Sequence, residues 1–397
     1  MEGKKHSSTP FESKMVSFCP AISGYNVLNV LCISGRLQKM ICFVISDISR
    51  CGGTERITLL IASELRRLGY DIHILSMYGK KKTYFDYNPK VKLHRLNRSI
   101  ELKLIHSHPK YSICKFRLWC ILHRPNVIID TSIMMGNITI PAIKGLPIKH
   151  IAWDNFSYEY YKQVNHEKIA LEKLIVNNSH LITLTAKDKE LFIKEQNVNP
   201  DLVHHIPNPL TFNQESPIQH HNKVVLSVGR FVHEKGFDLL LKAWKIVEQQ
   251  VEDWSLEIWG DTGHDTGNVY KTYQFLNLKR ASLHPATSNI IEKYRNASIY
   301  VLSSRHEGFG LVLLEASTMS LPLIAFDCPN GPREIIEDGV NGYLVESENV
   351  EKLAERLIVM MKDEGSRLEM GFNAYCLSKR YNINNIVVLW RDMLRHI

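Results

Sequence analysis

The fold of this chain is constrained most by short apolar runs that alternate with stretches of helical periodicity. Ile41–Ser46 is an apolar run that suits a buried parallel strand, and a turn with two glycines follows at Cys51–Thr54. Glu55–Leu68 then carries apolar residues at helical spacing, and Gly69 is a candidate C-cap. Asp71–Ser76 reads as the next strand. These segments predict a β-α-β unit, the seed of a doubly wound parallel sheet.

The alternation of strand and helix patterns begins a second time after a polar stretch, Asn213–Asn222. Further strands are predicted at 127–130, 150–153 and 181–185 before that stretch, and at 224–228, 256–259, 299–302 and 322–326 after it. A length of 397 residues is also too great for one ordinary core. We therefore expect an α/β fold of two Rossmann-like doubly wound domains that face a central cleft, at 40–212 and 213–384.

The two ends of the chain fall outside these series. Residues 1–39 lack the alternating pattern and a clear signal-peptide cleavage site. We interpret them as an N-terminal extension that is disordered or not native. The tail at 385–397, with Trp390 and Leu394, has the spacing of an amphipathic helix.

Charge and cysteine content narrow the function classes. The formal net charge of +8 favours anionic partners. The basic residues are dispersed and form no recognised nucleic-acid-binding motif, which argues against nucleic acid as the partner. The eight cysteines show no CxxC pair and no zinc spacing, so we expect reduced thiols in a cytoplasmic protein. No apolar run approaches the roughly 20 residues that a membrane-spanning helix needs.

The strongest chemical pattern is a strand, a glycine-bearing turn and a helix with two glutamates. A strand ends near Ser303, the turn is Glu307-Gly308-Phe309-Gly310, and the helix begins near Leu311 and carries Glu315. Backbone N–H groups at a helix N-terminus form a ready site for phosphate. Carboxylates beside that site suit the hydroxyl groups of a sugar rather than the phosphate itself. The alternative is an ordinary strand-turn-helix with two surface glutamates.

A second pattern places two cations around a similar turn. Arg230 and Lys235 lie five residues apart, between the strand at 224–228 and a helix from about Phe237. Such cations stabilise the charge on a leaving diphosphate without a metal ion, and the sequence has no Asp-x-Asp triplet to chelate one. We therefore expect neither a metal nor a cofactor. The alternative is two solvated basic residues on a loop.

Together these segments resemble the large retaining glycosyltransferase family with the GT-B fold, called family 4. Glu307 and Glu315 match its E-x7-E hallmark, and Arg230 with Lys235 matches its basic pair. The run 327–345 looks like the stretch that follows the hallmark, and 52–56 looks like the bacterial polysaccharide members.

The resemblance implies a role for each candidate residue. Arg230 and Lys235 would contact the donor phosphates, Glu315 the ribose, and Glu307 the donor sugar. The backbone of Gly308–Leu311 would reach sugar and phosphate, and the base would pack near Gly260 and Thr287. Gly52 and Gly53 would let the N-terminal loop approach the donor, while Asp154 and Asn155 would lie on the acceptor side. In the family the C-terminal helix crosses back to the N-terminal domain.

Asn155 and Thr262 depart from the family pattern. Many relatives carry histidine at the position of Asn155, and an amide cannot shuttle a proton at neutral pH. Thr262 breaks a usual Gly-x-Gly after Gly260. The first change leaves two interpretations open: either that histidine carries no proton in this branch, or activity is reduced.

Several readings of the whole protein follow from these patterns. The resemblance implies a hexosyl transfer from a nucleotide diphosphate sugar, most simply a UDP-sugar, to a lipid-linked, lipopolysaccharide, capsule or O-antigen acceptor. The alternatives are a UDP-sugar hydrolysing epimerase of the same fold and a non-catalytic relative that binds glycan or membrane. Lys80–Lys82 is a solvated loop face or a contact with an anionic inner membrane. The histidines at 106, 108, 204, 205, 220 and 221 are expected on the surface.

Overall fold

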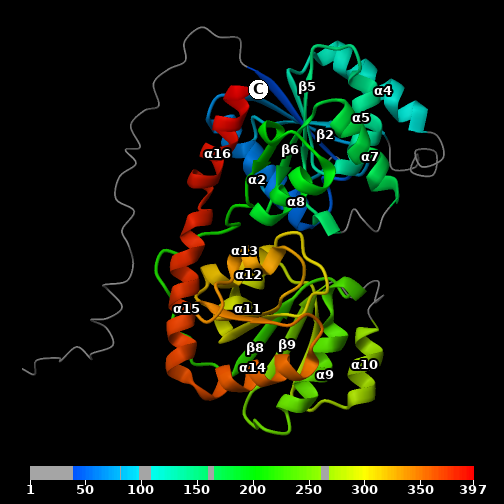
Figure 1. The fold of residues 1–397 in the computed structure, drawn as a ribbon. Helices are drawn as coiled ribbons and strands as arrows, with labels where there is room; N and C mark the ends of the chain where they lie inside the picture. The colour runs from blue at the N-terminus through cyan, green and yellow to red at the C-terminus, as the bar shows by residue number, and fades with distance from the viewer. Residues whose placement is uncertain (1–38, 81, 98–108, 160–164, 261–267) are drawn as a thin grey trace, which may run out of the picture. The chain divides into compact units, whose positions relative to one another are not determined.

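A computed structural model describes residues 39–397, except 81, 98–108, 160–164 and 261–267 (Figure 1). Some of the sequence predictions fall outside the described residues. They concern Lys81, Thr262, the histidines at 106 and 108, and the N-terminal extension at 1–39 apart from its last residue. Lys39, the last residue of that extension, is exposed.

The first sheet has seven strands in the order β3-β2-β1-β4-β5-β6-β7, and every neighbouring pair is parallel. Its strands are β1 (Met40–Ile45), β2 (Asp71–Ser76), β3 (Lys92–Arg95), β4 (Val127–Asp130), β5 (Lys149–Trp153), β6 (His180–Thr183) and β7 (Val203–His205). All residues of β1 and β4 are buried, as expected for central parallel strands covered on both faces.

The second sheet has six parallel strands in the order β10-β9-β8-β11-β12-β13. They are β8 (Val224–Val228), β9 (Ser255–Gly260), β10 (Ala281–Pro285), β11 (Ile299–Leu302), β12 (Leu323–Phe326) and β13 (Gly342–Val345). In both sheets the strand order reverses beside the first strand of the series, which is the doubly wound pattern. The prediction of two Rossmann-like domains is confirmed.

Helices connect the strands of each sheet. Those of the first series are α2 (Gly53–Arg67), α4 (Pro109–His123), α5 (Gly136–Ile143), α7 (Asn165–Val176) and α8 (Ala186–Gln196). Those of the second are α9 (Phe237–Val247), α10 (Val269–Leu276), α11 (Ile290–Asn296), α12 (Leu311–Thr318), α13 (Gly331–Ile335) and α14 (Val350–Lys362). The chain ends with α15 (Glu364–Ser378) and α16 (Ile383–His396), and short 3-10 turns lie at 133–135, 200–202, 233–235 and 379–381.

The sequence analysis missed four strands, and all four are edge strands: β3, β7, β10 and β13. An edge strand pairs on one side only and is short and partly solvated. In β3 all four residues are exposed or half-buried, and in β10 only Ala281 is buried. Strands of this kind lack the continuous apolar run that marks the central ones.

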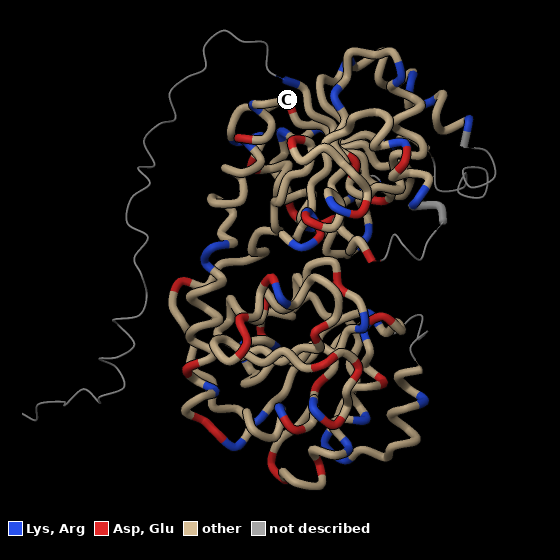
Figure 2. The backbone as a smooth tube through the Cα atoms, in the orientation of Figure 1, with Lys and Arg blue, Asp and Glu red and all other residues tan. Residues whose placement is uncertain are grey.

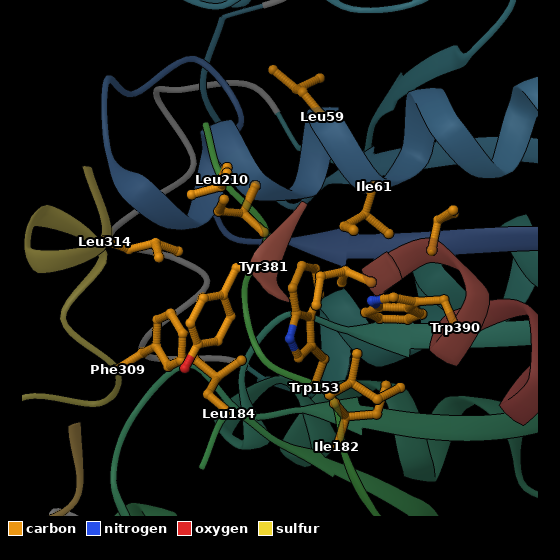
Figure 3. Close-up of a cluster of buried hydrophobic side chains, with 14 of the residues drawn as sticks. Leu59, Ile61, Trp153, Ile182, Leu184, Leu210, Phe309, Leu314, Tyr381 and Trp390 are labelled. Atoms are coloured by element: carbon orange, nitrogen blue, oxygen red, sulfur yellow. The ribbon is translucent and has the colours of Figure 1, made fainter. Parts of the chain in front are cut away.

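The last helix, α16, packs against the first sheet. Trp390 is 1% exposed, and its ring lies 4.9 Å from that of Trp153 on β5 (Figure 3). The Trp390 ring also lies 6.0 Å from that of Phe43 on β1. At the end of the helix, Lys39 Nζ donates to the Leu394 carbonyl at 3.2 Å. Residues from the end of the chain therefore complete the core that β1 begins.

The expectation that the paired histidines lie on the surface is wrong for His220. Its ring is buried and forms hydrogen bonds with the Met319 carbonyl at 2.6 Å and the Arg295 carbonyl at 3.1 Å. These bonds hold the polar stretch 213–222 against the second domain. His204 is half-buried on β7, where it stacks on His180 and its Nε2 lies 3.0 Å from His180 Nδ1. Burial, then the charges of His180 and Lys189, lower the pKa of His204 to about 4.

This lowered pKa predicts a loss of stability in mild acid. Between about pH 6.5 and 4 the unfolded chain binds a proton at residue 204 that the folded chain does not. The free energy of unfolding should therefore fall as the pH drops from 7 to 5. His204→Phe should flatten that dependence, measured by urea titration at several pH values. His221→Phe, at an exposed ring, is the matched control; equal slopes in both variants would contradict the prediction.

Candidate active site

Lys235 and Glu307 form the centre of the candidate site. Lys235 Nζ donates to Glu307 Oε1 at 2.5 Å, and Ser304 Oγ donates to the same oxygen at 2.8 Å. The approach of the two loops requires Gly236, because a Cβ there would lie 2.0 Å from the Ser303 carbonyl oxygen. Gly236 also has φ of +61°, in the left-handed region that favours glycine. The fold thus brings a cation and a carboxylate together in the loops that follow β8 and β11.

The turn that holds Glu307 leads directly into α12, as predicted. Gly310 has φ of +89° and precedes Leu311, the first residue of the helix. Phe309 is buried, and its ring meets that of Tyr381 edge-on at 5.7 Å (Figure 3). The aromatic contact anchors the turn, and the first N–H groups of α12 are left to bind a ligand.

Gly308 brings the Asp154–Asn155 segment against this turn. A Cβ at position 308 would lie 2.5 Å from the Asn155 carbonyl oxygen and 3.2 Å from the Phe156 Cα. Only a residue without a side chain fits such a contact. The segment after β5 and the turn after β11 are therefore packed backbone to backbone.

Asp154 and Asn155 differ in how they meet this site. Asp154 is 1% exposed, and its Oδ1 accepts a bond from the Phe156 N–H at 2.9 Å, so it holds the shape of its own turn. The Asn155 Nδ2 donates to the carbonyls of Thr131 at 2.8 Å and Trp153 at 3.4 Å. The Asn155 amide nitrogen thus binds backbone, while its main chain faces Gly308.

Glu315, on the first turns of α12, is surrounded by three donors. Its Oε1 accepts from Arg56 Nη1 at 2.9 Å and Thr211 Oγ1 at 2.8 Å, and its Oε2 accepts from the Tyr294 hydroxyl at 3.0 Å. Burial, then the charge of Glu315, raises the pKa of Tyr294, so its hydroxyl keeps its proton and donates. Glu315 itself is 7% exposed. Sequence reasoning assigned no role to Arg56, Thr211 or Tyr294.

The remaining predicted glycines, at positions 52, 53 and 260, lie where other atoms come close to the backbone. A Cβ on Gly53 would meet Leu311 Cδ2 at 3.3 Å, so the start of α2 lies against the start of α12. A Cβ on Gly52 would meet only the flexible Glu55 side chain, whereas one on Gly260 would lie 1.6 Å from the Gly229 carbonyl oxygen.

Arg230 and Thr287 are the residues that lie more open. The Arg230 side chain is exposed and forms no hydrogen bond or ion pair with any residue that the structure describes. Thr287 is half-buried after β10, where its Oγ1 accepts from the Asn289 N–H at 3.1 Å. The structure therefore brings Lys235, Glu307 and the turn together and leaves these two at the rim.

A pocket of about 600 Å³ with mixed polar and apolar walls lies near Glu307. Asn330, one of its lining residues, pairs with Glu307 through an isolated parallel bridge. Its Nδ2 also donates to Asp188 Oδ1 at 2.6 Å. The other lining residues are Glu159, Lys187, Leu191, Asp327, Cys328, Pro329 and Arg333. Carboxylates, an amide and cations suit the hydroxyl or phosphate groups of a second substrate.

The close contact at Gly308 carries a prediction. In Gly308→Ala the new methyl must push the Asn155 backbone away from the Glu307 turn, which should lower the rate of the reaction at this site at least tenfold because reacting groups tolerate little misplacement. Gly365→Ala, where the nearest atom outside the chain neighbours lies 3.5 Å away, should keep full activity. Initial rates with donor and acceptor measure both variants. Full activity in Gly308→Ala would mean that this junction is not part of the working site.

Two Rossmann-like domains, with a glycine-bearing turn that leads from a strand end into a helix, define a class of protein: a GT-B glycosyltransferase. Residues 51–213 match the family model described as Glycosyltransferase Family 4, and 210–376 match the one described as Glycosyl transferases group 1. An uncharacterized glycosyltransferase of Haemophilus influenzae is 30% identical over 365 residues, which cover 90% of this chain and 100% of that protein. The chain therefore belongs to glycosyltransferase family 4.

Other relatives and solved structures agree with this assignment. The amylovoran biosynthesis glycosyltransferase AmsD of Erwinia amylovora is 28% identical, over 88% of this chain and 98% of its own. The fold is similar to that of the lipopolysaccharide outer core galactosyltransferase WaaB, with a TM-score of 0.70 and 19% identity over 90% of this chain and 99% of that one. Anabaena HepE in complex with UDP and glucose gives 0.73, with 19% identity over the same shares. In the part of the chain that the structure describes, no helix is long and apolar enough to span a membrane.

Proposed function

We propose that the protein is a retaining hexosyltransferase that uses a nucleotide diphosphate sugar, most simply a UDP-sugar. The acceptor in this proposal is a lipid-linked or surface-polysaccharide glycan. The observation that carries the proposal is the 2.5 Å contact of Lys235 with Glu307, directly before the N-terminus of α12. This arrangement offers a cation and backbone N–H groups to a diphosphate and a carboxylate to the hydroxyls of the transferred sugar.

The charge that develops on the leaving diphosphate sets the role of each cation. As the bond between the anomeric carbon and the phosphate oxygen breaks, Lys235 stabilises the oxygen that gains charge, and Arg230 at the rim adds to this. In this proposal the two cations stabilise the charge that a divalent ion stabilises in other transferases, so no metal ion is needed.

Asn155 bears on the proposed retention of configuration. The acceptor oxygen forms its bond on the face that the phosphate leaves, and its proton passes to the departing phosphate oxygen. Such a step needs no histidine at position 155, whose amide is bonded to the Thr131 carbonyl. The pocket near Glu307, whose lining includes Glu159, Lys187 and Asp327, would take the acceptor.

The names of the relatives support the donor and acceptor classes. HepE has been solved with UDP and glucose, and AmsD is named for amylovoran biosynthesis. Against these stand a hydrolysing epimerase, which would release free nucleotide with no acceptor, and a non-catalytic binding protein. The engaged Lys235–Glu307 pair favours the transferase over the binding protein.

The test is a thermal-shift screen with UDP-, GDP- and ADP-sugars in the presence of EDTA, followed by product analysis. A ligand that binds only the folded protein raises its melting temperature by mass action. We expect stabilisation by the uridine compounds, which Glu307→Gln weakens for the sugar nucleotide but not for UDP itself. Inverted product, or dependence on a divalent ion, would overturn the corresponding part of the proposal. Failure of every nucleotide to bind would overturn all of it.

We further propose that α4 contacts an anionic membrane, where a lipid-linked acceptor would reside. Its solvent-facing side carries large apolar side chains: Tyr111 is 46%, Leu118 57% and Leu122 69% exposed. Residues 109–124 contain Lys110, Lys115, Arg117 and Arg124 and no acidic residue (Figure 2). An exposed apolar stripe flanked by cations is the pattern of a helix that lies in the surface of an anionic bilayer.

Vesicle sedimentation tests this contact. The wild-type protein should sediment with vesicles of mixed anionic and neutral phospholipids, and Leu118→Glu with Leu122→Glu should lower the bound fraction at least tenfold. Phe275→Glu, at a side chain 87% exposed on α10, is the matched control and should bind as the wild type does. Equal losses in both variants, or no binding by the wild type, would exclude α4 as the membrane contact.

A further inference from the structure

Arg56, in the first turns of α2, is a residue to which the resemblance to the family assigned no role, yet it binds Glu315 directly. Its Nη1 donates to Glu315 Oε1 at 2.9 Å, and its Nη2 donates to the Thr211 carbonyl at 3.3 Å. The guanidinium also lies over two aromatic rings, 5.6 Å from the centroid of Phe85 and 5.9 Å from that of Phe212. The fork is therefore fixed from several sides.

The hydrogen bonds of Glu315 are unevenly distributed over its two oxygens. Oε1 accepts from both Arg56 and Thr211, whereas Oε2 accepts from the Tyr294 hydroxyl alone among the described residues. A carboxylate offers about four acceptor positions, two on each oxygen. Oε1 is thus saturated, and one position on Oε2 is left for a hydroxyl group of a ligand.

We propose that Arg56 is a positioning residue, which fixes Glu315 so that Oε2 accepts a ribose hydroxyl of the nucleotide. This inference rests on the proposed function, since it assumes a nucleoside diphosphate in the site. It adds a residue of the N-terminal domain to the recognition of the nucleoside.

The sequence around Arg56 fits this role. Gly53 lets the start of α2 lie against Leu311, and the Arg56 N–H bonds the Gly52 carbonyl at 3.1 Å in the first turn of the helix. The same turn that makes room beside the donor site therefore carries the arginine that reaches Glu315. Lysine could supply the charge, but it has a single donor nitrogen, whereas the planar fork of arginine presents one nitrogen to the carboxylate and another to the Thr211 carbonyl.

Loss of Arg56 should act on one contact of the ligand rather than on all of them. Without the guanidinium, the Glu315 carboxylate keeps only the hydroxyls of Thr211 and Tyr294 as donors among the described residues, and it is free to turn. Such a turn removes the oriented acceptor for the ribose. Contacts to the diphosphate, made from Lys235 and the turn, remain.

The test is a cycle of variants and ligands, read by calorimetry. The ligands are the nucleoside diphosphate that stabilises the wild type, and its 2′-deoxy and 3′-deoxy analogues. The wild type should bind the hydroxyl-bearing ligand at least tenfold more tightly than one of the analogues. In Arg56→Ala that ratio should fall close to one, whereas affinity for that analogue should change less than threefold. Arg56→Lys, which keeps the charge and most of the volume, should give an intermediate ratio and serves if the alanine variant does not fold.

Arg50→Ala is the matched control, because Arg50 lies just before the same glycines and its side chain is 64% exposed. It should leave the ratio unchanged. If Arg56→Ala and Arg56→Lys weaken all ligands equally, Arg56 serves only the stability of the fold and the inference is wrong, while the proposed function stands. If the wild type binds no nucleoside diphosphate at all, the proposed function itself fails and takes this inference with it.

Discussion

Lys235→Met is expected to lower the rate of glycosyl transfer by about 100- to 1000-fold while the protein stays folded, the range found when one preorganised donor to a developing anion is removed. Methionine keeps the length of the side chain but carries no charge. The Lys235 ammonium lies 2.5 Å from Glu307 Oε1, so it is held beside the turn to which the proposed function assigns the donor diphosphate. Its loss removes the cation that opposes charge build-up and leaves Glu307 with the Ser304 hydroxyl as its remaining donor among the described residues.

The measurement is the turnover number at saturating donor, together with the affinity for the nucleotide. Lys242→Met, at an exposed position on α9, is the control for loss of one positive charge and should react at the wild-type rate. A Lys235→Met variant with a wild-type turnover number and weaker donor binding would show that Lys235 binds substrate but does not assist bond breaking.

Trp390→Ala should reduce the free energy of unfolding by about 3–5 kcal/mol, the cost of removing a large aromatic side chain from a packed core. The indole is 1% exposed and contacts Trp153 and Phe43, two of the large side chains on the central strands of the first sheet. Because the neighbouring rings belong to β1 and β5, they cannot collapse far enough to fill the space.

Urea titration, monitored by far-UV circular dichroism so that the signal does not depend on tryptophan fluorescence, measures this loss of stability. Leu389→Ala, next in sequence but 43% exposed on the other side of α16, should cost less than about 1 kcal/mol. If the two variants lose similar stability, α16 is held mainly by contacts other than its buried face.

The central parts of the fold could be predicted from the sequence because burial on both faces leaves its mark on consecutive residues. Val127–Asp130 and Ile299–Leu302 are wholly buried and were placed at their observed bounds. Lys92–Arg95 and Ala281–Pro285 belong to strands only through hydrogen bonds with a neighbour on one side. Their own side chains carry no such mark, so a local pattern could not find them.

The candidate site divides in the same way. The turn at 307–310 and the start of α12 follow from a local pattern of glycines and apolar residues, and the structure has them where that pattern put them. The partners of Glu315 could not be predicted, because Arg56 lies 259 residues away and Thr211 lies 104 away. Such contacts depend on how the chain is folded, and no spacing in the sequence encodes them.

The position of α16 has a consequence for the order in which the protein acquires its structure during synthesis. The strands of the first sheet, β1 to β7, leave the ribosome long before Trp390, which packs against Phe43 and Trp153. At ordinary elongation rates the delay is on the order of ten seconds or more. During that interval the nascent first domain exposes the apolar floor that α16 will cover. The second sheet, whose strands end at Val345, can finish earlier. The half of the enzyme that is made first is therefore completed last.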